Sequence, residues 1–358
     1  MKNIICILAI VFIISGCNSK RFLDAIDLEE ALTNVIQIRN EIAYLPDENE
    51  PFTGKYEEYY STNGQKKSET NYIDGKQNGL FTSWYENGKK ENEGNYKEGK
   101  QNGLFTTWYE NGQKKSETNY IDGTVDGLYS LWYESGQKKT EINYQDGEMN
   151  GLFIWWYENG QKESETNFKE GKENLLATGW YENGQKESEG TFKEDKKTGL
   201  WIEWHENGKK KSEGAFEGNK KTGLWTDFYD NGQKKSEAEY KDNGKNGKST
   251  AWYANGTKKN EGLLENNQQT GKWECWYEKG AKYWEGEFKD GKENGFFTYW
   301  YENGAKASEG EYLNGKKVGK HTTWHDNGQK KSEGEYKDGQ RTGEWLLWDQ
   351  QGNPMQAR

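Results

Sequence analysis

A single glycine spacing constrains this chain more than any other feature. The glycine at position 64 recurs every 24 residues up to Gly352, thirteen times, and no insertion interrupts the spacing. Series that begin at Trp84 and at Glu69 keep the same period, and Phe228 is the one replacement in the tryptophan series. Each such series is named here as a column, after its first member. Phase kept over so long a stretch predicts repeated units that stack on one another in one geometry.

Each unit carries the sequence signature of a β-hairpin. Asn87-Gly88 lies between two strand-like runs, and this dipeptide favours a two-residue turn in which both residues have positive φ. Such a turn pairs Trp84 with Glu91 and Phe81 with Gly94. The hairpins are therefore predicted to keep one fixed register.

A second turn joins each hairpin to the next. At the position of Gly75, the column contains only Gly, Asn or Asp, the residue types that tolerate the left-handed conformation. We therefore predict an all-β fold: an elongated, single-layer antiparallel β-meander, a ribbon of hairpins with right-handed twist. At about 4.8 Å between strands, some 26 strands give a ribbon on the order of 120 Å long.

The predicted register also assigns side chains to the two faces of the sheet. One face carries Phe81, Tyr85 and Tyr96, and the other carries Leu80, Thr82, Trp84 and Glu93. The column opposite Phe81 is Gly in seven of twelve units, which lets an aromatic ring lie over bare backbone. The Phe81 face is therefore predicted to be the packing face, on the concave side. A three-residue turn would swap the two faces.

Two stretches depart from the repeat. In 172–179 the joining glycine is replaced by Leu175 and the aromatic residue by Ala177, and in 246–251 the aromatic residue is Ser249. We predict a bend or a local soft spot at the first stretch.

Composition excludes several other readings of the chain. Only 31% of residues are hydrophobic, yet 15% are aromatic, so a large aliphatic core cannot form, whereas disordered chains lack aromatic residues. The net charge of −11 makes nucleic-acid binding improbable, because an acidic chain repels phosphate backbones.

The first residues indicate export and lipid anchoring. Residues 1–16 carry a single charged side chain, Lys2, followed by eleven apolar residues, Ile4 to Ile14. This pattern is typical of a signal peptide, and the apolar run is too short to span a bilayer. Ile14-Ser15-Gly16-Cys17 resembles the bacterial lipobox. The resemblance implies cleavage before Cys17 and acylation of its thiol with fatty-acid chains such as palmitate, which would hold the mature chain at the cell membrane or the outer membrane.

The rest of the chain is divided by the limits of the repeat. We predict a tether and cap over 17–50, with a short helix starting at Asp27 and short strands over 35–38 and 42–45. About twelve repeats then occupy 51–353, followed by a tail over 354–358 in which Pro354 blocks further pairing. Cys275 is expected to be a buried thiol.

Catalytic and metal-binding residues are not evident. His205 and His325 occupy the Tyr85 column and His321 the Phe81 column, so all three are interpreted as aromatic replacements. The Glu69 column offers evenly spaced single carboxylates, which fit cross-strand pairing with Lys and Thr better than a calcium cage. No metal and no cofactor is predicted.

The Trp84 column is the best binding candidate in the sequence. A row of indoles about 10 Å apart suits sugar rings, lipid headgroups or an apolar ridge of a partner, and the alternative role is packing against the Leu80 column. The candidate binding stripe consists of Trp84, Trp108, Trp132, Trp156, Trp180, Trp204, Trp252, Trp276, Trp300 and Trp324.

The units resemble the bacterial variant of the MORN repeat. The resemblance depends on Trp84 through Gly88, on Glu93, Tyr96 and Gly99, on the Asn102-Gly103 pair, and on their equivalents in other units. It covers about 52–353 and implies an elongated twisted β-sheet without shared catalytic residues. One branch consists of YwqK-type antitoxins, and other members are lipoproteins. Choline-binding cell-wall repeats are less similar, because their period is shorter and they lack the Asp-Gly-Lys joint.

Two functions are compatible with these features, and neither is enzymatic. The first is a membrane-anchored, non-catalytic scaffold that binds a protein or a polysaccharide of the cell envelope. The alternative, suggested by the resemblance alone, is an antitoxin or immunity-like inhibitor of a toxin. The lipobox favours the scaffold, because a cytosolic antitoxin needs no anchor.

Overall fold

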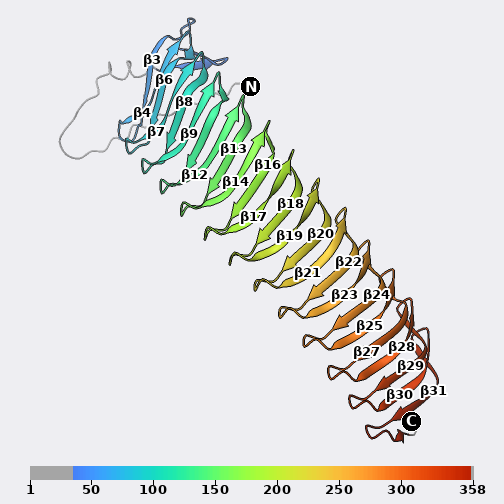
Figure 1. Cartoon of the computed structure of the whole chain (residues 1–358). Helices are drawn as coiled ribbons and strands as arrows, with labels where there is room; N and C mark the ends of the chain where they lie inside the picture. The colour runs from blue at the N-terminus through green and yellow to red at the C-terminus, as the bar shows by residue number, and fades with distance from the viewer. Residues whose placement is uncertain (1–34, 356–358) are drawn as a thin grey trace, which may run out of the picture.

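The computed structural model describes residues 35–355, and its regular structure is entirely β (Figure 1). A small N-terminal sheet pairs β1 (Gln37–Arg39) with β2 (Ile42–Tyr44), close to the two short strands expected there. Predicted features within residues 1–34, including the signal peptide, Cys17 and the helix at Asp27, lie outside the described residues. No helix within 35–355 has the length and apolarity needed to cross a membrane.

One long sheet contains all the remaining strands. They are β3 (Gly54–Tyr59), β4 (Lys66–Ile73), β5 (Lys76–Gln77), β6 (Gly79–Trp84), β7 (Lys90–Lys97), β8 (Lys100–Trp108), β9 (Lys114–Ile121), β10 (Thr124–Val125), β11 (Gly127–Trp132), β12 (Lys138–Gln145), β13 (Glu148–Trp156), β14 (Lys162–Lys169), β15 (Lys172–Glu173), β16 (Leu175–Trp180), β17 (Lys186–Lys193), β18 (Lys196–Trp204), β19 (Lys210–Glu217), β20 (Lys220–Phe228), β21 (Lys234–Lys241), β22 (Gly244–Trp252), β23 (Lys258–Glu265), β24 (Gln268–Trp276), β25 (Lys282–Lys289), β26 (Lys292–Glu293), β27 (Gly295–Trp300), β28 (Lys306–Leu313), β29 (Lys316–Trp324), β30 (Lys330–Lys337), β31 (Gln340–Trp348) and β32 (Pro354–Met355).

Every pairing in this sheet is antiparallel and links neighbours along the chain. Strands β5, β10, β15 and β26 are short first segments of strands that continue after a one-residue break. In the described chain, β3 pairs only with β4 and β32 only with β31, so the sheet is open at both ends. Figure 1 shows the hairpins in a row along one axis, with β3 at one end and β31 at the other. The predicted antiparallel meander of hairpins is confirmed.

The Asn-Gly turn has three residues rather than the predicted two. The N–H of Gly88 donates to the carbonyl of Tyr85 at 2.9 Å, and the N–H of Tyr85 donates to the carbonyl of Lys89. Only Gly88 has positive φ, +80°, which describes a type I turn followed by a glycine bulge. Asn87 avoids the left-handed region because its side chain accepts the Lys89 N–H at 3.0 Å and donates to the Glu110 carbonyl of the next unit at 3.0 Å.

A bulge after this turn restores the predicted faces. Trp84 pairs with Lys90, so the predicted pairing of Trp84 with Glu91 is wrong. Glu91 has no partner on the facing strand, and beyond it Thr82 pairs with Glu93, as the predicted register requires. The extra turn residue and the extra bulge residue offset each other. The faces therefore do not swap, although the turn is the longer kind.

The two-residue turn with two positive φ values occurs instead at the joint between units. Asp74 and Gly75 have φ of +49° and +72°, as a type I′ turn requires. The following glycine position, Gly79, also has positive φ, +97°. The joint therefore depends on two glycine columns.

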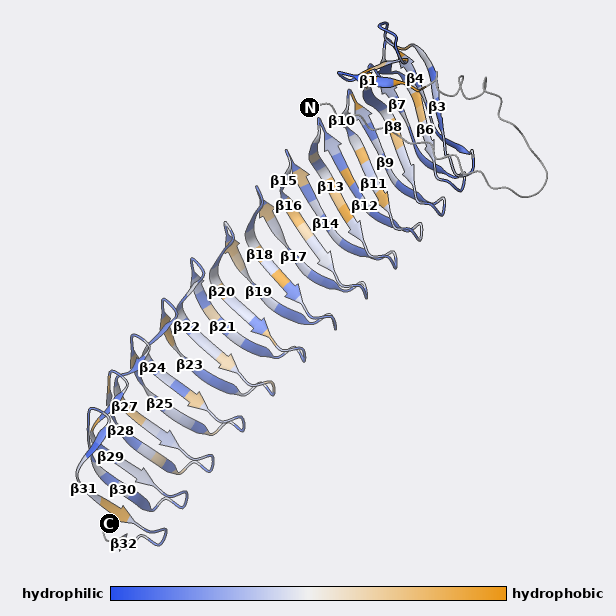
Figure 2. Ribbon diagram, turned by 180° about the vertical axis from the view of Figure 1, so that it is seen from behind, coloured by the Kyte–Doolittle hydropathy of each residue, from blue (hydrophilic) through white to orange (hydrophobic). Residues whose placement is uncertain are grey.

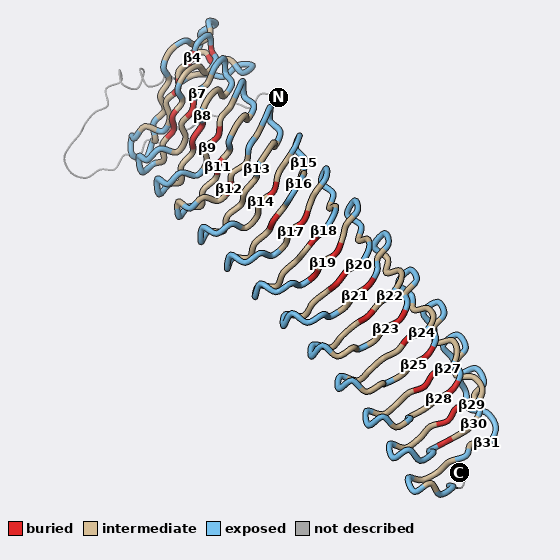
Figure 3. Tube along the Cα trace, viewed as in Figure 1, coloured by how far each residue is buried: buried red, intermediate tan, exposed pale blue. Residues whose placement is uncertain are grey.

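An aromatic ladder fills the Phe81 face, and its buried rings form much of the core. Figure 3 shows that buried residues recur in successive strands along the ribbon. The ring of Phe105 lies over Gly94, which faces it on the preceding strand. Tyr96 packs edge-on between Phe81 and Phe105 at 5.9 and 5.7 Å. The ring that covers each glycine thus belongs to the following hairpin, whereas the sequence suggested a ring within the same hairpin. This face is a packing face, as predicted.

Hydrogen bonds between successive turns keep the units in phase. The hydroxyl of Tyr85 donates to the carbonyl of Trp108, one unit further on, at 2.7 Å. The same bond recurs along the ribbon, and at its C-terminal end His325 Nε2 lies 3.0 Å from the carbonyl of Trp348. A residue inserted into one unit would shift its turn relative to the turn of the next unit, and the hydrogen bonds between them could not all form. This explains why no insertion breaks the period of the repeat.

The C-terminal end continues the sheet instead of stopping it. Asp349 forms the usual turn bonds with Gly352 and Asn353, and Pro354 and Met355 then pair with Trp348 and Leu347. The prediction that Pro354 blocks pairing was wrong, since a proline at the first residue of an edge strand leaves no ladder bond unmade.

Replacing Leu175 by glycine is expected to stabilise the ribbon. Pairing runs through 172–179 without a register error, but Leu175 has φ +73° and is 60% exposed. The left-handed conformation costs about 1–2 kcal/mol in a non-glycine residue. After the entropy that glycine adds to the unfolded chain, L175G should raise the opening free energy measured by hydrogen exchange in β16 and β17 by about 0.5–1 kcal/mol. The neighbouring L176G, where φ is not positive, should lose a similar amount.

Candidate functional site

All ten predicted tryptophans of the Trp84 column lie on one face of the sheet, each at the end of its strand. Trp84 ends β6, Trp108 ends β8, and the others end the equivalent strands. Each side chain is half-buried. The structure thus brings together Trp84, Trp108, Trp132, Trp156, Trp180, Trp204, Trp252, Trp276, Trp300 and Trp324 as one column. Their role in binding remains a prediction.

A lysine from the preceding unit covers each of these indoles. The ammonium of Lys66 lies 5.7 Å from the ring centre of Trp84, and that of Lys258 lies 5.1 Å from Trp276. These are cation–π contacts, and they occur at all ten positions. Sequence reasoning missed them. The signal was present, because the Lys66 column is lysine in all twelve units.

The Glu69 column pairs with the same lysines. Lys66 bonds to Glu69, three residues further along its own strand, and this pair repeats in every unit through Lys330–Glu333 at 2.7 Å. The expected cross-strand partners are secondary, since a second lysine from the facing strand contributes in only four of the twelve units, through Lys55, Lys248, Lys272 and Lys320. Each unit therefore presents one combination of indole, ammonium and carboxylate, which leaves no carboxylate of this column free to bind calcium.

Acidification should remove one of these interactions over a defined pH range. Hydrogen bonds from Lys320 and Lys330 lower the pKa of Glu333 to about 2. A carboxyl whose pKa is lower in the folded chain stabilises the fold above its unfolded value, and this contribution disappears as the pH falls from about 4.5 to about 2. Hydrogen exchange in β29 and β30 should therefore show K320M to be less stable than the wild type at pH 7 and nearly as stable at pH 2. A difference that persists at pH 2 would assign the effect to packing.

The Leu80 column gives the two ends of this face different characters (Figure 2). Seven leucines from Leu80 to Leu224 are 37–60% exposed, so they do not cover the indoles. In later units the column holds Lys248, Lys272, Lys320 and Glu344, with Phe296 as the one apolar member. The N-terminal part of the face is therefore apolar beside the tryptophans, and the C-terminal part is mostly charged.

The three histidines act as aromatic replacements, as predicted. His205 Nε2 lies 3.2 Å from the carbonyl of Phe228, in place of the usual tyrosine hydroxyl. His321 is 5% exposed, its ring lies over Gly310, and burial lowers its pKa. Within 35–355 no three His, Cys, Asp or Glu residues gather as metal ligands. Cys275 is half-buried, and burial raises the pKa of its thiol.

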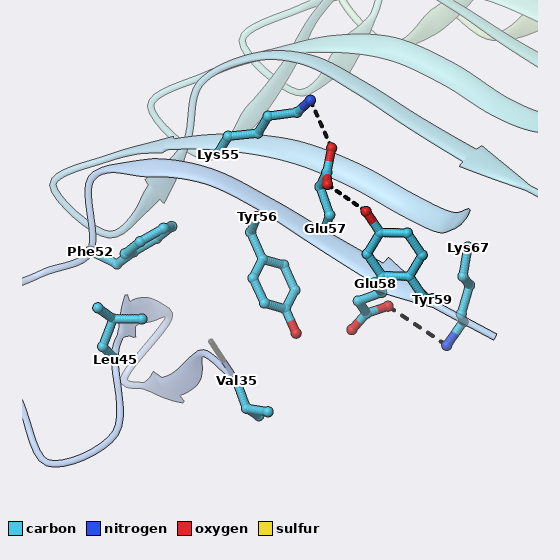
Figure 4. A pocket seen from close by; sticks show the side chains of 9 residues that line it. All are labelled: Val35, Leu45, Phe52, Lys55, Tyr56, Glu57, Glu58, Tyr59 and Lys67. Atoms are coloured by element: carbon cyan, nitrogen blue, oxygen red, sulfur yellow. Dashed lines mark hydrogen bonds and ion pairs between the residues drawn. The ribbon is translucent and has the colours of Figure 1, made fainter. Parts of the chain in front are cut away.

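One open hollow lies at the N-terminal end of the sheet, with a volume of 930 Å³ (Figure 4). Val35, Phe52 and Tyr56 contribute apolar surface to it. Its charged groups are already engaged with each other, since Glu57 accepts bonds from Lys55 at 2.7 Å and from the Tyr59 hydroxyl at 2.6 Å.

The fold and its columns define a β-hairpin repeat protein. The model of the MORN repeat variant matches eight segments: 77–98, 101–122, 125–146, 149–170, 173–194, 197–217, 221–242 and 317–338. These segments match the MORN repeat variant, and the strands between 244 and 313 continue the same columns. The expected repeat type is thus confirmed.

Other comparisons add little about this chain. No curated protein matches it. Among solved structures, it is similar to the TcdB2-TccC3-Cdc42 crystal structure (10% identity, TM-score 0.16, 87% of this chain and 23% of that chain). It is also similar to the Photorhabdus luminescens Tc holotoxin pore (11% identity, TM-score 0.16, 87% and 22%). This chain spans less than a quarter of either, and no argument is drawn from them.

Proposed function

We propose that this chain is a membrane-anchored lipoprotein that acts as a non-catalytic scaffold and binds a protein or polysaccharide of the cell envelope. The observation that carries the proposal is the repetition of one indole, ammonium and carboxylate group along an open sheet face. A long row of identical groups suits an extended partner, because weak contacts at successive units add to one avidity. The same repetition leaves no polar group set apart for catalysis in this column.

The binding stripe can be tested without unfolding the ribbon. Phe228 already replaces a tryptophan in this column within a paired strand, so a Trp108, Trp132 and Trp156 triple change to Phe should fold. The matching triple change to Ala removes the rings. Cross-linking of the full chain to isolated envelopes should fall several-fold for the Ala triple and less for the Phe triple. Equal cross-linking by the folded Ala triple and the wild type would exclude the stripe.

The anchor has a separate test. Cys17 follows the apolar segment and is the proposed acyl acceptor, which would place the chain at the cell membrane or outer membrane. C17S should move the protein from the membrane to the soluble fraction and abolish labelling with a palmitate analogue, while C275S should change neither. Labelling that survives in C17S would refute the anchor. The antitoxin alternative requires a 1:1 complex with a toxin, and no contact in the ribbon favours it.

A further inference from the structure

One unit departs from the repeat at two successive positions, and a third aromatic residue lies beside them on the same side of the sheet. Tyr283 occupies a column that is Lys or Glu in ten of the twelve units, and Trp284 occupies one that is otherwise Ser, Thr or Asn. Tyr299 lies opposite Trp284 on the next strand, in a variable column that holds Ser83, Trp155 and Leu347 elsewhere. Tyr283 and Trp284 are consecutive, and strand pairing brings Tyr299 beside them, so the three side chains form one local feature on the Phe81 face.

These side chains form a continuous aromatic surface. The ring centre of Tyr283 lies 4.7 Å from that of Tyr277 and 6.3 Å from that of Tyr299. Beneath them, Phe297 stacks with Tyr299 at 6.2 Å and contacts Trp284 at 6.0 Å. In the preceding unit, a lysine ammonium covers the equivalent tyrosine, Lys259 over Tyr253 at 5.5 Å. Here an aromatic ring takes the place of that cation.

The surface is supported from below and open above. Phe297 is 1% exposed and fixes the upper rings, while Tyr283 is 40% exposed, and Trp284 and Tyr299 are half-buried. The Tyr299 hydroxyl donates to Glu293 Oε1 at 3.2 Å. The apolar rings thus have a hydroxyl and a carboxylate at their margin.

We propose that Tyr283, Trp284 and Tyr299 form a binding platform for a pyranose ring of a polysaccharide. A pyranose offers one face of C–H groups that packs on an aromatic ring, and hydroxyls at its rim that need hydrogen-bond partners. The platform supplies both, with Glu293 and the Tyr299 hydroxyl as the polar partners. A phosphate ligand is disfavoured by the carboxylate. This inference deepens the proposed function, on which it rests, by naming a ligand class and a second site on the opposite face from the Trp84 column.

The repeat itself supplies the substitutions for a test. The triple variant Y283K, W284S and Y299T introduces residues that stand at the same positions in other units, as Lys259, Ser308 and Thr323 do, so the hairpin should still fold. Calorimetric titration of the full chain with the hexamer of N-acetylglucosamine, and sedimentation with isolated peptidoglycan, give the readouts. We expect the triple variant to lose at least about tenfold in affinity, as loss of a central aromatic cluster does.

The control changes two of these columns in the unit before. K259A and N260S alter the residues equivalent to Tyr283 and Trp284, while Cys275 is kept because it pairs with Trp284, and binding should be unchanged. The platform is refuted if the wild type binds neither sugar, or if the folded Y283K, W284S and Y299T variant binds as tightly as the wild type. The scaffold proposal is tested separately by the Trp108, Trp132 and Trp156 variants, whose envelope cross-linking does not depend on this unit.

Discussion

Replacing Phe297 by alanine is expected to destabilise its part of the ribbon by about 3–5 kcal/mol, as removal of a fully buried aromatic side chain does. Phe297 is 1% exposed, lies over Gly286, and contacts Phe288 and Tyr312 at 5.4 and 5.1 Å. The ribbon has one layer, so no second layer can collapse into the space that the ring leaves. The adjacent Phe296 is 52% exposed and serves as the matched control.

The measurement must be local because the chain is a row of stacked units. Long repeat arrays do not unfold in one cooperative step, so a single global transition would average over undisturbed hairpins. Hydrogen exchange of the amides in β27 and β28 reports the opening free energy of this region. F297A should lower it by the amount given above, and F296A should change it by less than about 0.5 kcal/mol. Equal losses for the two variants would show that the Phe81 face is not the core.

The architecture of the ribbon could be predicted from sequence because its determinants are local. Asn-Gly and Asp-Gly pairs specify reversals, and the alternation from Leu80 to Trp84 specifies which side chains share a face. The turn type was wrong because it depends on a contact between units, in which the Asn87 side chain donates to the Glu110 carbonyl. The two partners of that bond are 23 residues apart in sequence, and the conformational propensities of single residues contain no information about such a contact.

The contacts of the candidate binding stripe could be predicted from the sequence only in part, for the same reason. Spacing alone placed the tryptophans on one face, but it did not show that Lys90 would lie over Trp108 and bond Glu93 as well. That outcome requires the bulge at Glu91, which turns Lys90 toward the tryptophan face. The platform at Tyr283 and Trp284 went unnoticed for a different reason. Tyr299 is separated from the other two along the chain, and only its pairing with Trp284 makes it their neighbour.

Adding a single methyl group at Gly214 is expected to cost about 1–3 kcal/mol, the usual range for overpacking a filled site. Strand propensity predicts the opposite sign, since glycine is a poor strand residue and its φ here is one that alanine adopts freely. The distances decide the matter. A Cβ on Gly214 would lie 2.2 Å from Cδ2 of Trp225, so the indole would have to move away. That shift breaks its Nε1 bond to the Ala215 carbonyl, now 3.0 Å.

The chain already contains the compensated version of this change. Ala238 occupies the glycine column and is 3% exposed, and the residue that faces it is Ser249 rather than an aromatic. G214A should therefore be harmful next to Trp225 and nearly neutral in a W225S background, where the methyl group meets no ring. A double-mutant cycle on the opening free energy of β19 and β20 measures this coupling. If G214A costs the same in both backgrounds, the glycine column serves the backbone and not the rings above it. In that case the contact with the aromatic rings would not be the reason why this column contains glycine.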